Sequence, residues 1–387
     1  MLHKRLLHFA SRTQRTLLGV GPMSVNCVDA VIDLANTFDT MILLVASRRQ
    51  IESAAMGGGY VNHWTTEAFA DYVVQKDKKA HVILSRDHGG PWQHEQEKAQ
   101  KLSLRQAMAS AKESFRVDIE SGMEIIHIDT SIDIHGTPSS DEMLLRVFEL
   151  YEYCWEVARQ NKKNIVFEIG TEEQTGGTQS GEDLFKLFSE MKRFCTTNRL
   201  PLPVFIVIQV GTRVMETGNI GSFESPQRID HELPAEIQIP RMVEICNRNG
   251  IFIKAHNTDY LSDEALSWYP KLGIHAANVA PEFGVLETRG FLGLLAERGL
   301  TEQREAFLEL AYHSGKWKKW LLPDSRATDE ERAIIAGHYV FSDPHFLAIK
   351  HKAQERIADL LIDDYLKDLL KANLMRYLKL FRLLRTA

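Results

Sequence analysis

Eight short apolar runs alternate with longer segments of helical periodicity, and this alternation constrains the fold more than any other feature. Several runs are nearly continuous in Val, Ile, Leu and Phe, as expected of parallel strands buried on both faces. The predicted strands are Leu17–Val20, Met41–Ala46, His81–Ser85, Ile125–Asp129, Ile165–Glu168, Val204–Val210, Ile251–Ala255 and Ile274–Val279. Because a parallel βα sheet closes at eight strands, we predict an α/β fold of the (β/α)8 TIM-barrel type, with an open sheet as the alternative.

The alternation ends near residue 300, so we predict a barrel domain over residues 1–300. The remaining segment, 301–387, is charged and helical, with a break at Leu321–Ser325. No Ser/Gly-rich linker separates the two parts in the sequence. We therefore expect a C-terminal helical extension that packs on the barrel rather than one tethered to it.

Composition narrows the class of protein. The formal net charge is −6 without a long acidic or basic block, which argues against nucleic acid as a partner. The four cysteines are widely scattered and form no CxxC pair, which is typical of reduced thiols. No run reaches the roughly 18 apolar residues of a membrane span, and the N-terminus has no signal-peptide pattern. We expect a cytoplasmic protein that does not bind membranes.

Polar residues follow the apolar runs where each predicted strand ends. Asp87 and His88 end the third strand, before Gly-Gly-Pro91; Glu168 ends the fifth, and His256 follows the seventh. Further polar residues at strand ends are His127, Asp129, Gln209, Lys254 and Asn278. Since the active sites of such barrels form at the carboxyl ends of the strands, these positions predict a catalytic site there.

His88, Glu168 and His256 form a reasonable divalent-metal set. Two neutral imidazoles and a carboxylate are a common open zinc arrangement, which leaves a position for a substrate oxygen. The alternative is that each histidine is a structural residue with its hydrogen bonds satisfied. Asp87 would transfer a proton at a hydroxyl or, alternatively, cap the following turn. Regular alternation would point Asp87 and His88 to opposite faces, unless the turn relaxes it.

Lys254 shares the strand parity of His256, so both should face the barrel interior. A buried lysine can form a Schiff base, which supports a rival mechanism. The alternative is an ion pair with Glu168 or another inner carboxylate, because buried charges are usually paired.

Turns after the sixth and seventh strands could hold an anion. Backbone N–H groups at Gly211, Asn257 and Thr258 could cradle a phosphate, with Arg213 adding positive charge. Ordinary turn chemistry is the alternative explanation.

Four segments together resemble the tagatose-bisphosphate aldolase GatZ/KbaZ-like family, which is related to the class II fructose- and tagatose-bisphosphate aldolases. The segments are Asp87-His-Gly-Gly-Pro91, Ile126-His-Ile-Asp-Thr-Ser131, Glu168-Ile-Gly-Thr-Glu172 and Ala255-His-Asn-Thr-Asp-Tyr260, and Phe341-Ser-Asp343 in the extension is also similar. The resemblance implies a (β/α)8 barrel, a sugar-phosphate substrate, a proton-transferring Asp87 and a divalent metal, expected to be Zn²⁺. The expected site residues are Asp87, Glu172 and Lys254 in catalysis; Gln209, Gly211, Arg213, Asn257, Thr258, Asp259 and Asn278 in substrate binding; and His88, Glu168 and His256 at the metal.

One departure leaves two functions open. Class II aldolases carry a zinc-binding histidine after the sixth strand, where this chain has Gln209-Val-Gly-Thr212. GatZ/KbaZ proteins share that loss and are usually described as non-catalytic subunits. One hypothesis is an enzyme of metal-assisted retro-aldol or aldol chemistry, a lyase or epimerase, acting on a phosphorylated or nucleotide-linked sugar. The other is a non-catalytic subunit that stabilises a tagatose-bisphosphate aldolase. The expected partners are accordingly a second copy of the chain or an aldolase chain.

Overall fold

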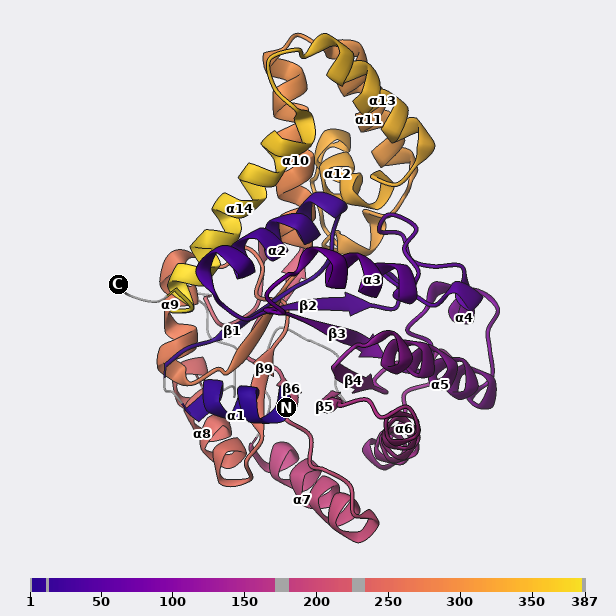
Figure 1. The fold of residues 1–387 in the computed structure, drawn as a ribbon, viewed down its shortest axis with the longest axis vertical. Helices are drawn as coiled ribbons and strands as arrows, with labels where there is room; N and C mark the ends of the chain where they lie inside the picture. The colour runs from indigo at the N-terminus through magenta and orange to yellow at the C-terminus, as the bar shows by residue number, and fades with distance from the viewer. Residues whose placement is uncertain (1, 12–13, 171–180, 225–233, 385–387) are drawn as a thin grey trace.

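Eight parallel strands close into a barrel in the computed structural model, which describes residues 2–11, 14–170, 181–224 and 234–384 (Figure 1). Neighbouring strands follow chain order around the barrel, and the last strand pairs with the first. The barrel strands are β1 (Leu17–Val20), β2 (Ile42–Ser47), β3 (Val82–Gly89), β4 (Ile125–Asp129), β5 (Val166–Gly170), β6 (Phe205–Ile208), β9 (Phe252–Ala255) and β10 (Ala276–Val279). The predicted (β/α)8 barrel is confirmed, and the open-sheet alternative is wrong.

The predicted strand bounds differ from the observed ones mainly at the strand ends. β1 and β4 match their predicted ranges, whereas β3 continues past Ser85 to Gly89. Asp87 and His88 therefore belong to β3 itself rather than to a turn after it. A short hairpin, β7 (Val214–Met215) and β8 (Gly218–Asn219), follows β6 outside the barrel.

Helices cover the outside of the barrel, and several begin at a side-chain cap. Ser139 and Glu142 form a capping box before α6, and Ser262 Oγ accepts the Ala265 N–H before α9. The helices are α2 (Val25–Phe38), α3 (Thr66–Lys76), α4 (Glu95–Ala99), α5 (Leu104–Ser121), α6 (Ser140–Gln160), α7 (Gly181–Asn198), α8 (Ala235–Arg248), α9 (Asp263–Leu272) and α10 (Pro281–Glu297), with the 3-10 turn η1 (Ala54–Met56).

An N-terminal helix, α1 (Leu2–Ser11), packs at the amino end of the barrel. Its Leu2 and Leu6 are buried in one apolar cluster with strand residues such as Leu17, Ile83 and Phe252. This end of the barrel is thus filled by apolar side chains, so the polar chemistry must lie at the carboxyl ends of the strands.

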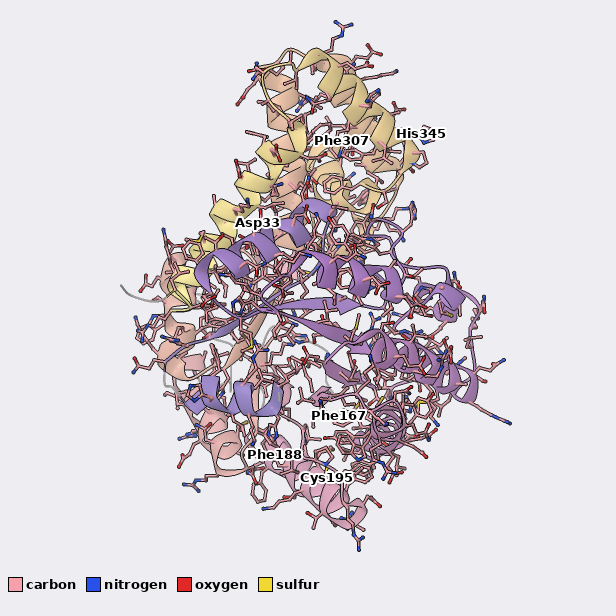
Figure 2. The ribbon with its side chains drawn as sticks, in the orientation of Figure 1. Asp33, Phe167, Phe188, Cys195, Phe307 and His345 are labelled. Atoms are coloured by element: carbon pink, nitrogen blue, oxygen red, sulfur yellow. The ribbon has the colours of Figure 1, made fainter. Side chains whose placement is uncertain are left out.

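The C-terminal extension packs its apolar side chains in a cluster with the end of α10 and then returns to the barrel. Its elements are α11 (Thr301–His313), η2 (Lys318–Trp320), α12 (Asp329–Ala336), η3 (Gly337–Val340), α13 (Pro344–Arg356) and α14 (Ile362–Leu380). Phe307 belongs to the extension's cluster, whereas Phe167 and Phe188 belong to the main cluster of the barrel (Figure 2). α14 runs back along α2 and buries Leu370 and Leu374 in that main cluster (Figure 1). The division of the chain at residue 300 stays a prediction.

No helix in the described ranges is both long enough and apolar enough to cross a membrane. All four cysteines are buried as free thiols.

Candidate active site

A bulge at the end of β3 turns two consecutive side chains toward the same space. The pairing of β3 with β4 passes from Arg86 opposite Ile126 to Gly89 opposite Ile128, so β3 has one extra residue there. His88 adopts a left-handed backbone φ of 45° within this stretch. A bulge interrupts the regular alternation of side chains across a strand. Asp87 and His88 can therefore both line one cavity, which regular alternation would forbid.

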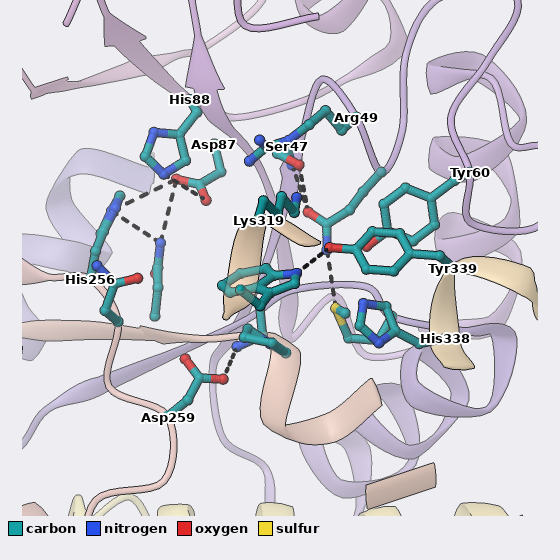
Figure 3. A pocket seen from close by; sticks show the side chains of 17 residues that line it. Ser47, Arg49, Tyr60, Asp87, His88, His256, Asp259, Lys319, His338 and Tyr339 are labelled. Atoms are coloured by element: carbon teal, nitrogen blue, oxygen red, sulfur yellow. Dashed lines mark hydrogen bonds and ion pairs between the residues drawn. The ribbon is translucent and has the colours of Figure 1, made fainter. Parts of the chain in front are cut away.

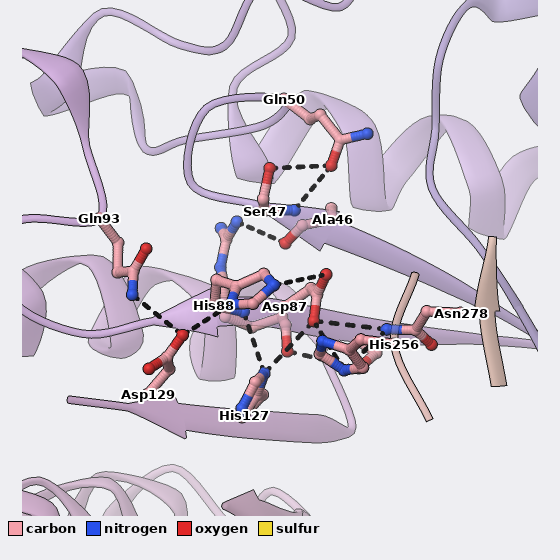
Figure 4. Close-up of polar contacts among 12 residues, drawn as sticks. Ala46, Ser47, Gln50, Asp87, His88, Gln93, His127, Asp129, His256 and Asn278 are labelled. Atoms are coloured by element: carbon pink, nitrogen blue, oxygen red, sulfur yellow. Dashed lines mark hydrogen bonds and ion pairs between the residues drawn. The ribbon is translucent and has the colours of Figure 1, made fainter. Parts of the chain in front are cut away.

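Side chains on or directly after four barrel strands bring donor atoms within 4.8 Å of one another: Asp87, His127, Glu168 and His256. Figure 4 shows Asp87, His127 and His256 of this group. His127 Nδ1 lies 3.3 Å from Asp87 Oδ1 and 3.7 Å from Glu168 Oε1. His256 Nε2 lies 3.4 Å from Glu168 Oε1 and 3.7 Å from Asp87 Oδ1. The register of the barrel explains part of this convergence, because His127 and Glu168 are paired residues on β4 and β5.

The contacts of His127 bring one of its ring nitrogens next to two carboxylate oxygens. The backbone N–H of His88 donates to His127 Nδ1 over 3.1 Å. The same nitrogen faces the oxygens of Asp87 and Glu168. Imidazole nitrogens and carboxylate oxygens gathered this closely are the donor set of a cation site.

His88 adds a third imidazole to the group. Its ring centre is 5.3 Å from that of His127 and 5.0 Å from that of His256, and the latter two are 5.4 Å apart. All three rings surround the Asp87 carboxylate, with His88 Nε2 3.9 Å from Asp87 Oδ2. Imidazoles that share one ion through bonds of about 2.0–2.1 Å have ring centres about 5 Å apart. The spacing of the three rings is thus compatible with a shared ion.

Asp129, from the end of β4, fixes the orientation of His88. Its Oδ2 lies 2.6 Å from His88 Nδ1 and also accepts a hydrogen bond of 3.0 Å from Gln93 Nε2 (Figure 4). This contact leaves Nε2 of His88 directed toward the cluster. Histidines that bind a metal almost always donate the second ring N–H to a carboxylate or carbonyl, and His88 has this arrangement.

Lys254, on β9, pairs with Glu168 inside the barrel. Lys254 Nζ lies 2.6 Å from Glu168 Oε2, and neither side chain exposes any surface. Glu168 Oε1 remains directed at His256 and His127. The ion pair that the sequence offered as the alternative to a Schiff-base lysine is therefore present, and Lys254 is not among the residues that line the cavity.

Both central carboxyl groups are held in the ionised form. Burial alone would raise the pKa of Asp87, but the imidazoles of His88, His256 and His127 outweigh it and hold that pKa well below its usual range. Burial also opposes ionisation of Glu168, yet mainly the Lys254 ammonium lowers its pKa to about 2. Ionised carboxylates are the form that binds cations and accepts protons.

The imidazoles differ in their electrostatic environment. Burial disfavours the His88 imidazolium, but the carboxylates of Asp87 and Asp129 outweigh it and raise the pKa of His88 to about 9. Burial lowers the pKa of His256, and the opposing effect of Asp87 is not sufficient to reverse it. His256 therefore favours the neutral form, which is the form that binds metals.

A cavity of about 130 Å³ opens over this cluster, and the extension forms one of its walls (Figure 3). Asp87, His88 and His256 line it from the barrel strands. The barrel loops add Met23, Ser47, Arg49, Gln50, Tyr60, Asn257, Asp259, Asn278, Ala280 and Pro281, and the extension adds Lys319, Trp320, His338 and Tyr339.

The structure places only some of the residues predicted to bind substrate at the cavity. Asn257, Asp259 and Asn278 line the cavity, and Thr258 is buried next to them. Gln209, Gly211 and Arg213 do not line it. Arg213 is exposed, and its backbone N–H donates to Asn219 Oδ1 at the β7–β8 hairpin. Glu172 lies outside the described residues.

Several residues of the site and its pocket had no predicted role, among them His127, Arg49, Lys319 and His338. His127 was visible as a strand-end residue, but its place beside Glu168 depends on the observed register, in which Ile125 pairs with Val166. The other three depend on how loops and the extension fold over the barrel, for which the sequence contains no local signal.

The comparisons with known proteins agree with this architecture. The chain matches the family described as D-tagatose-1,6-bisphosphate aldolase subunit GatZ/KbaZ-like over residues 8–361. It is similar in structure to a probable tagatose 6 phosphate kinase from Sinorhizobium meliloti 1021, with 17% identity, a TM-score of 0.71 and coverage of 95% of this chain and 100% of that one.

Two further solved structures share the fold. One is the fructuronate-tagaturonate epimerase UxaE from Cohnella laeviribosi, with 12% identity, a TM-score of 0.62 and coverage of 98% of this chain and 84% of that one. The other is the fructose-bisphosphate aldolase Fba from Campylobacter jejuni, with 11% identity, a TM-score of 0.55 and coverage of 99% and 94%. Because the family match spans most of its length, the chain belongs to the D-tagatose-1,6-bisphosphate aldolase subunit GatZ/KbaZ-like family.

Proposed function

We propose that this protein is a metal-dependent, class II aldolase-like enzyme. It would break or form a carbon–carbon bond in a phosphorylated or nucleotide-linked sugar, as a lyase or as an epimerase that works through retro-aldol cleavage. The observation that carries the proposal is the convergence of three imidazoles with Asp87 and Glu168 at the carboxyl end of the barrel. Membership of the GatZ/KbaZ-like family supports a sugar-phosphate substrate.

The side chains that would hold the ion are His88, His127, His256 and Glu168. Asp129 already occupies the second nitrogen of His88, and Lys254 occupies the second oxygen of Glu168, so each presents one donor atom to the cluster. His127, from β4, would take the place of the histidine that is absent after β6. Imidazole nitrogens with one carboxylate suit Zn²⁺, and a bound divalent ion would supply Lewis-acid polarisation of a substrate carbonyl.

Asp87 is the group best placed to move a proton. Its carboxylate is ionised, lines the cavity and lies between the three imidazoles. Asn278 Nδ2 lies 3.5 Å from Asp87 Oδ1 and 3.2 Å from His256 Nε2. In the cleavage direction Asp87 would take the proton from the substrate hydroxyl whose carbon becomes a carbonyl. The adjacent carbon–carbon bond breaks as this proton leaves, and its electron pair passes to the fragment that carries the ketose carbonyl, which becomes an enolate. In the condensation direction the enolate carbon attacks the aldehyde, and Asp87 returns the proton to the new hydroxyl.

Replacement of Asp87 by asparagine tests this role. We expect Asp87→Asn to retain its metal but to lose turnover of a ketose-phosphate panel by roughly 10²- to 10⁴-fold, the range typical of a missing acid–base group. Asp39→Asn is the matched control, because Asp39 is a half-exposed carboxylate that pairs with His81, away from the cavity. Undiminished turnover by Asp87→Asn, or a metal-free and inactive wild type, would reject the proposal.

The rival Schiff-base mechanism makes a different prediction. Lys254 is enclosed and paired with Glu168, so its amine is not presented to a substrate carbonyl. We expect borohydride reduction in the presence of substrate to leave Lys254 unmodified. A trapped adduct at Lys254 in the peptide mass map would instead establish the lysine mechanism.

A second function is a non-catalytic subunit that stabilises an aldolase chain. Two observations favour it: the family is described as an aldolase subunit, and β6 is followed by Gln209 rather than a histidine. Co-purification with a class II aldolase chain, together with no turnover by the isolated protein, would support this function. Turnover by the isolated homogeneous protein would exclude it.

A further inference from the structure

We propose that Arg49 and Lys319 form a subsite for the phosphate group of the substrate, so that the C-terminal extension takes a direct part in substrate binding. The proposal deepens the proposed function, and rests on it for the identity of the rest of the substrate. It assigns the phosphate to a different place from the turns after β6 and β9.

Two cations from distant parts of the chain meet at this pocket. Arg49 follows β2 at the carboxyl end of the barrel, and the backbone C=O of Arg49 accepts the Tyr60 N–H. Lys319 lies in η2 of the extension. Both line the same cavity as Asp87 and His88, as Figure 3 shows. Arg49 also lies close enough to His88 for its charge to oppose protonation of that imidazole.

Neither cation is neutralised by a direct contact within the ranges that the structure describes. Among the described residues, neither side chain forms an ion pair or hydrogen bond, and Lys319 Nζ instead lies 4.9 Å and 5.2 Å from the ring centres of Trp320 and Tyr339. The nearby carboxylate of Glu95 is paired with Lys316 over 2.7 Å. Two cations that no carboxylate contacts directly favour an anionic ligand between them.

The electrostatics of Lys319 agree with this placement. Burial lowers the pKa of Lys319 to about 7, and repulsion by the Arg49 guanidinium adds to this effect against the weaker attraction of Glu95. An anion between the two groups would remove that repulsion. The forked guanidinium and the compact ammonium are both common phosphate ligands, and two cations match a dianionic phosphate monoester better than a singly charged carboxylate.

The unpaired ring of His338 is a second, independent sign that a ligand belongs against the extension's side of the cavity. The residue is 2% exposed, and among the described residues neither of its ring nitrogens has a hydrogen-bond partner. Burial lowers the pKa of His338 to about 3, so the ring is neutral and has one donor and one acceptor. Buried polar groups are nearly always satisfied, and a hydroxyl of the sugar next to the phosphate would satisfy this one.

Arg213, the cation that the sequence offered for this role, is exposed beside the β7–β8 hairpin and does not line the cavity. It therefore provides a control that separates the two candidate anion sites. Lys318 provides the second control, because it is the lysine next to Lys319 in η2 but is not part of the pocket wall.

Calorimetric titration of the full-length, metal-free protein tests the subsite without requiring catalysis. The probes are inorganic phosphate, a ketose monophosphate, the unphosphorylated ketose and a sugar acid. We expect Arg49→Gln and Lys319→Gln each to weaken binding of phosphate and of the ketose monophosphate roughly 10- to 100-fold, as loss of a charge-assisted contact does. Lys318→Gln and Arg213→Gln should bind as the wild type does, and all four variants should show the wild-type circular dichroism spectrum.

Three results would overturn the proposal: a wild type that does not bind phosphate, unchanged affinity in both pocket variants, or a sugar acid bound as tightly as the ketose monophosphate. Loss of binding in Arg213→Gln alone would assign the phosphate to the β7–β8 hairpin instead. The outcome is separable from that of the proposed function. A protein that binds phosphate through Arg49 and Lys319 but holds no metal would retain the subsite and refute only the metal chemistry.

Discussion

Glu287, on α10, is a buried carboxyl group outside the candidate active site. Its Oε2 accepts a hydrogen bond of 2.5 Å from Ser24 Oγ, and its Oε1 accepts one of 2.9 Å from Asn26 Nδ2. Burial raises the pKa of Glu287 to about 7, and these hydrogen bonds lower it only in part. The folded state therefore prefers the protonated form. The corresponding stability is fully present below the ordinary glutamate pKa and is lost as the pH rises through about 7.

Glu287→Gln should remove this pH dependence. A neutral amide of the same shape is not penalised for ionising, so the variant should gain stability over the wild type as the pH rises from 4.5 to 8. The gain should be on the order of 3 kcal/mol, since each pKa unit corresponds to about 1.4 kcal/mol. Urea unfolding across this pH range measures it. A constant difference between the two proteins at every pH would contradict the expected linkage.

At the scale of single residues, the sequence located much of the candidate site. Asp87, His88, Glu168 and His256 could be placed together because each ends a strand and parallel barrel strands end at one edge. The role of His127 required the β4–β5 register, which sets it beside Glu168. Strict alternation would have separated Asp87 from His88, and the bulge that reunites them depends on contacts between strands.

At the scale of elements, two glycines allow β3 to approach its neighbours. A Cβ at Gly90 would lie 1.9 Å from the Asp129 carbonyl oxygen, and one at Gly89 would lie 2.4 Å from the Phe115 ring. No other residue type fits such distances without displacement of the backbone. This approach brings His88 within reach of the Asp129 carboxylate.

Gly90→Ala should push the end of β3 away from β4. We expect the variant to lose about 1–3 kcal/mol of stability, as overpacked substitutions do, and also to bind divalent metal more weakly than the wild type. Gly136→Ala is the matched control, since a Cβ there meets no atom within 4 Å. Thermal unfolding and metal titration provide both readouts. If Gly90→Ala matched Gly136→Ala in both stability and metal affinity, the close approach of β3 to β4 would have no role in shaping the site.

At the scale of the whole molecule, the extension and the barrel are joined by α14. Its Leu370, Leu374 and Tyr377 are fully buried in the main cluster, and Tyr377 Oη donates to Glu282 Oε2 at the start of α10. The sequence predicted a packed extension from the absence of a linker. It could not predict which surface the extension covers, because that depends on contacts between residues hundreds of positions apart. Lys319 and His338 could therefore not be assigned to the pocket.

Leu374→Ala tests whether this helix is integral to the fold. We expect a loss of about 2–5 kcal/mol in the free energy of unfolding, the range for truncating a buried leucine. Leu347→Ala on α13 is the control, because Leu347 is 49% exposed and its replacement should change stability by less than about 0.5 kcal/mol. Chemical denaturation measures the free energy of unfolding of both variants and of the wild type. Equal, small effects would mean that α14 packs only loosely on the barrel.

The measurement that tests the account most directly is the metal content of the purified protein and three histidine variants after equilibration with Zn²⁺ and dialysis. The wild type and His275→Asn should retain a stoichiometric ion, because His275 precedes β10 at the opposite end of the barrel. His127→Asn and His256→Asn should lose it. A wild type that retains no ion, or a His127→Asn variant that retains it fully, would contradict the metal centre proposed for this barrel.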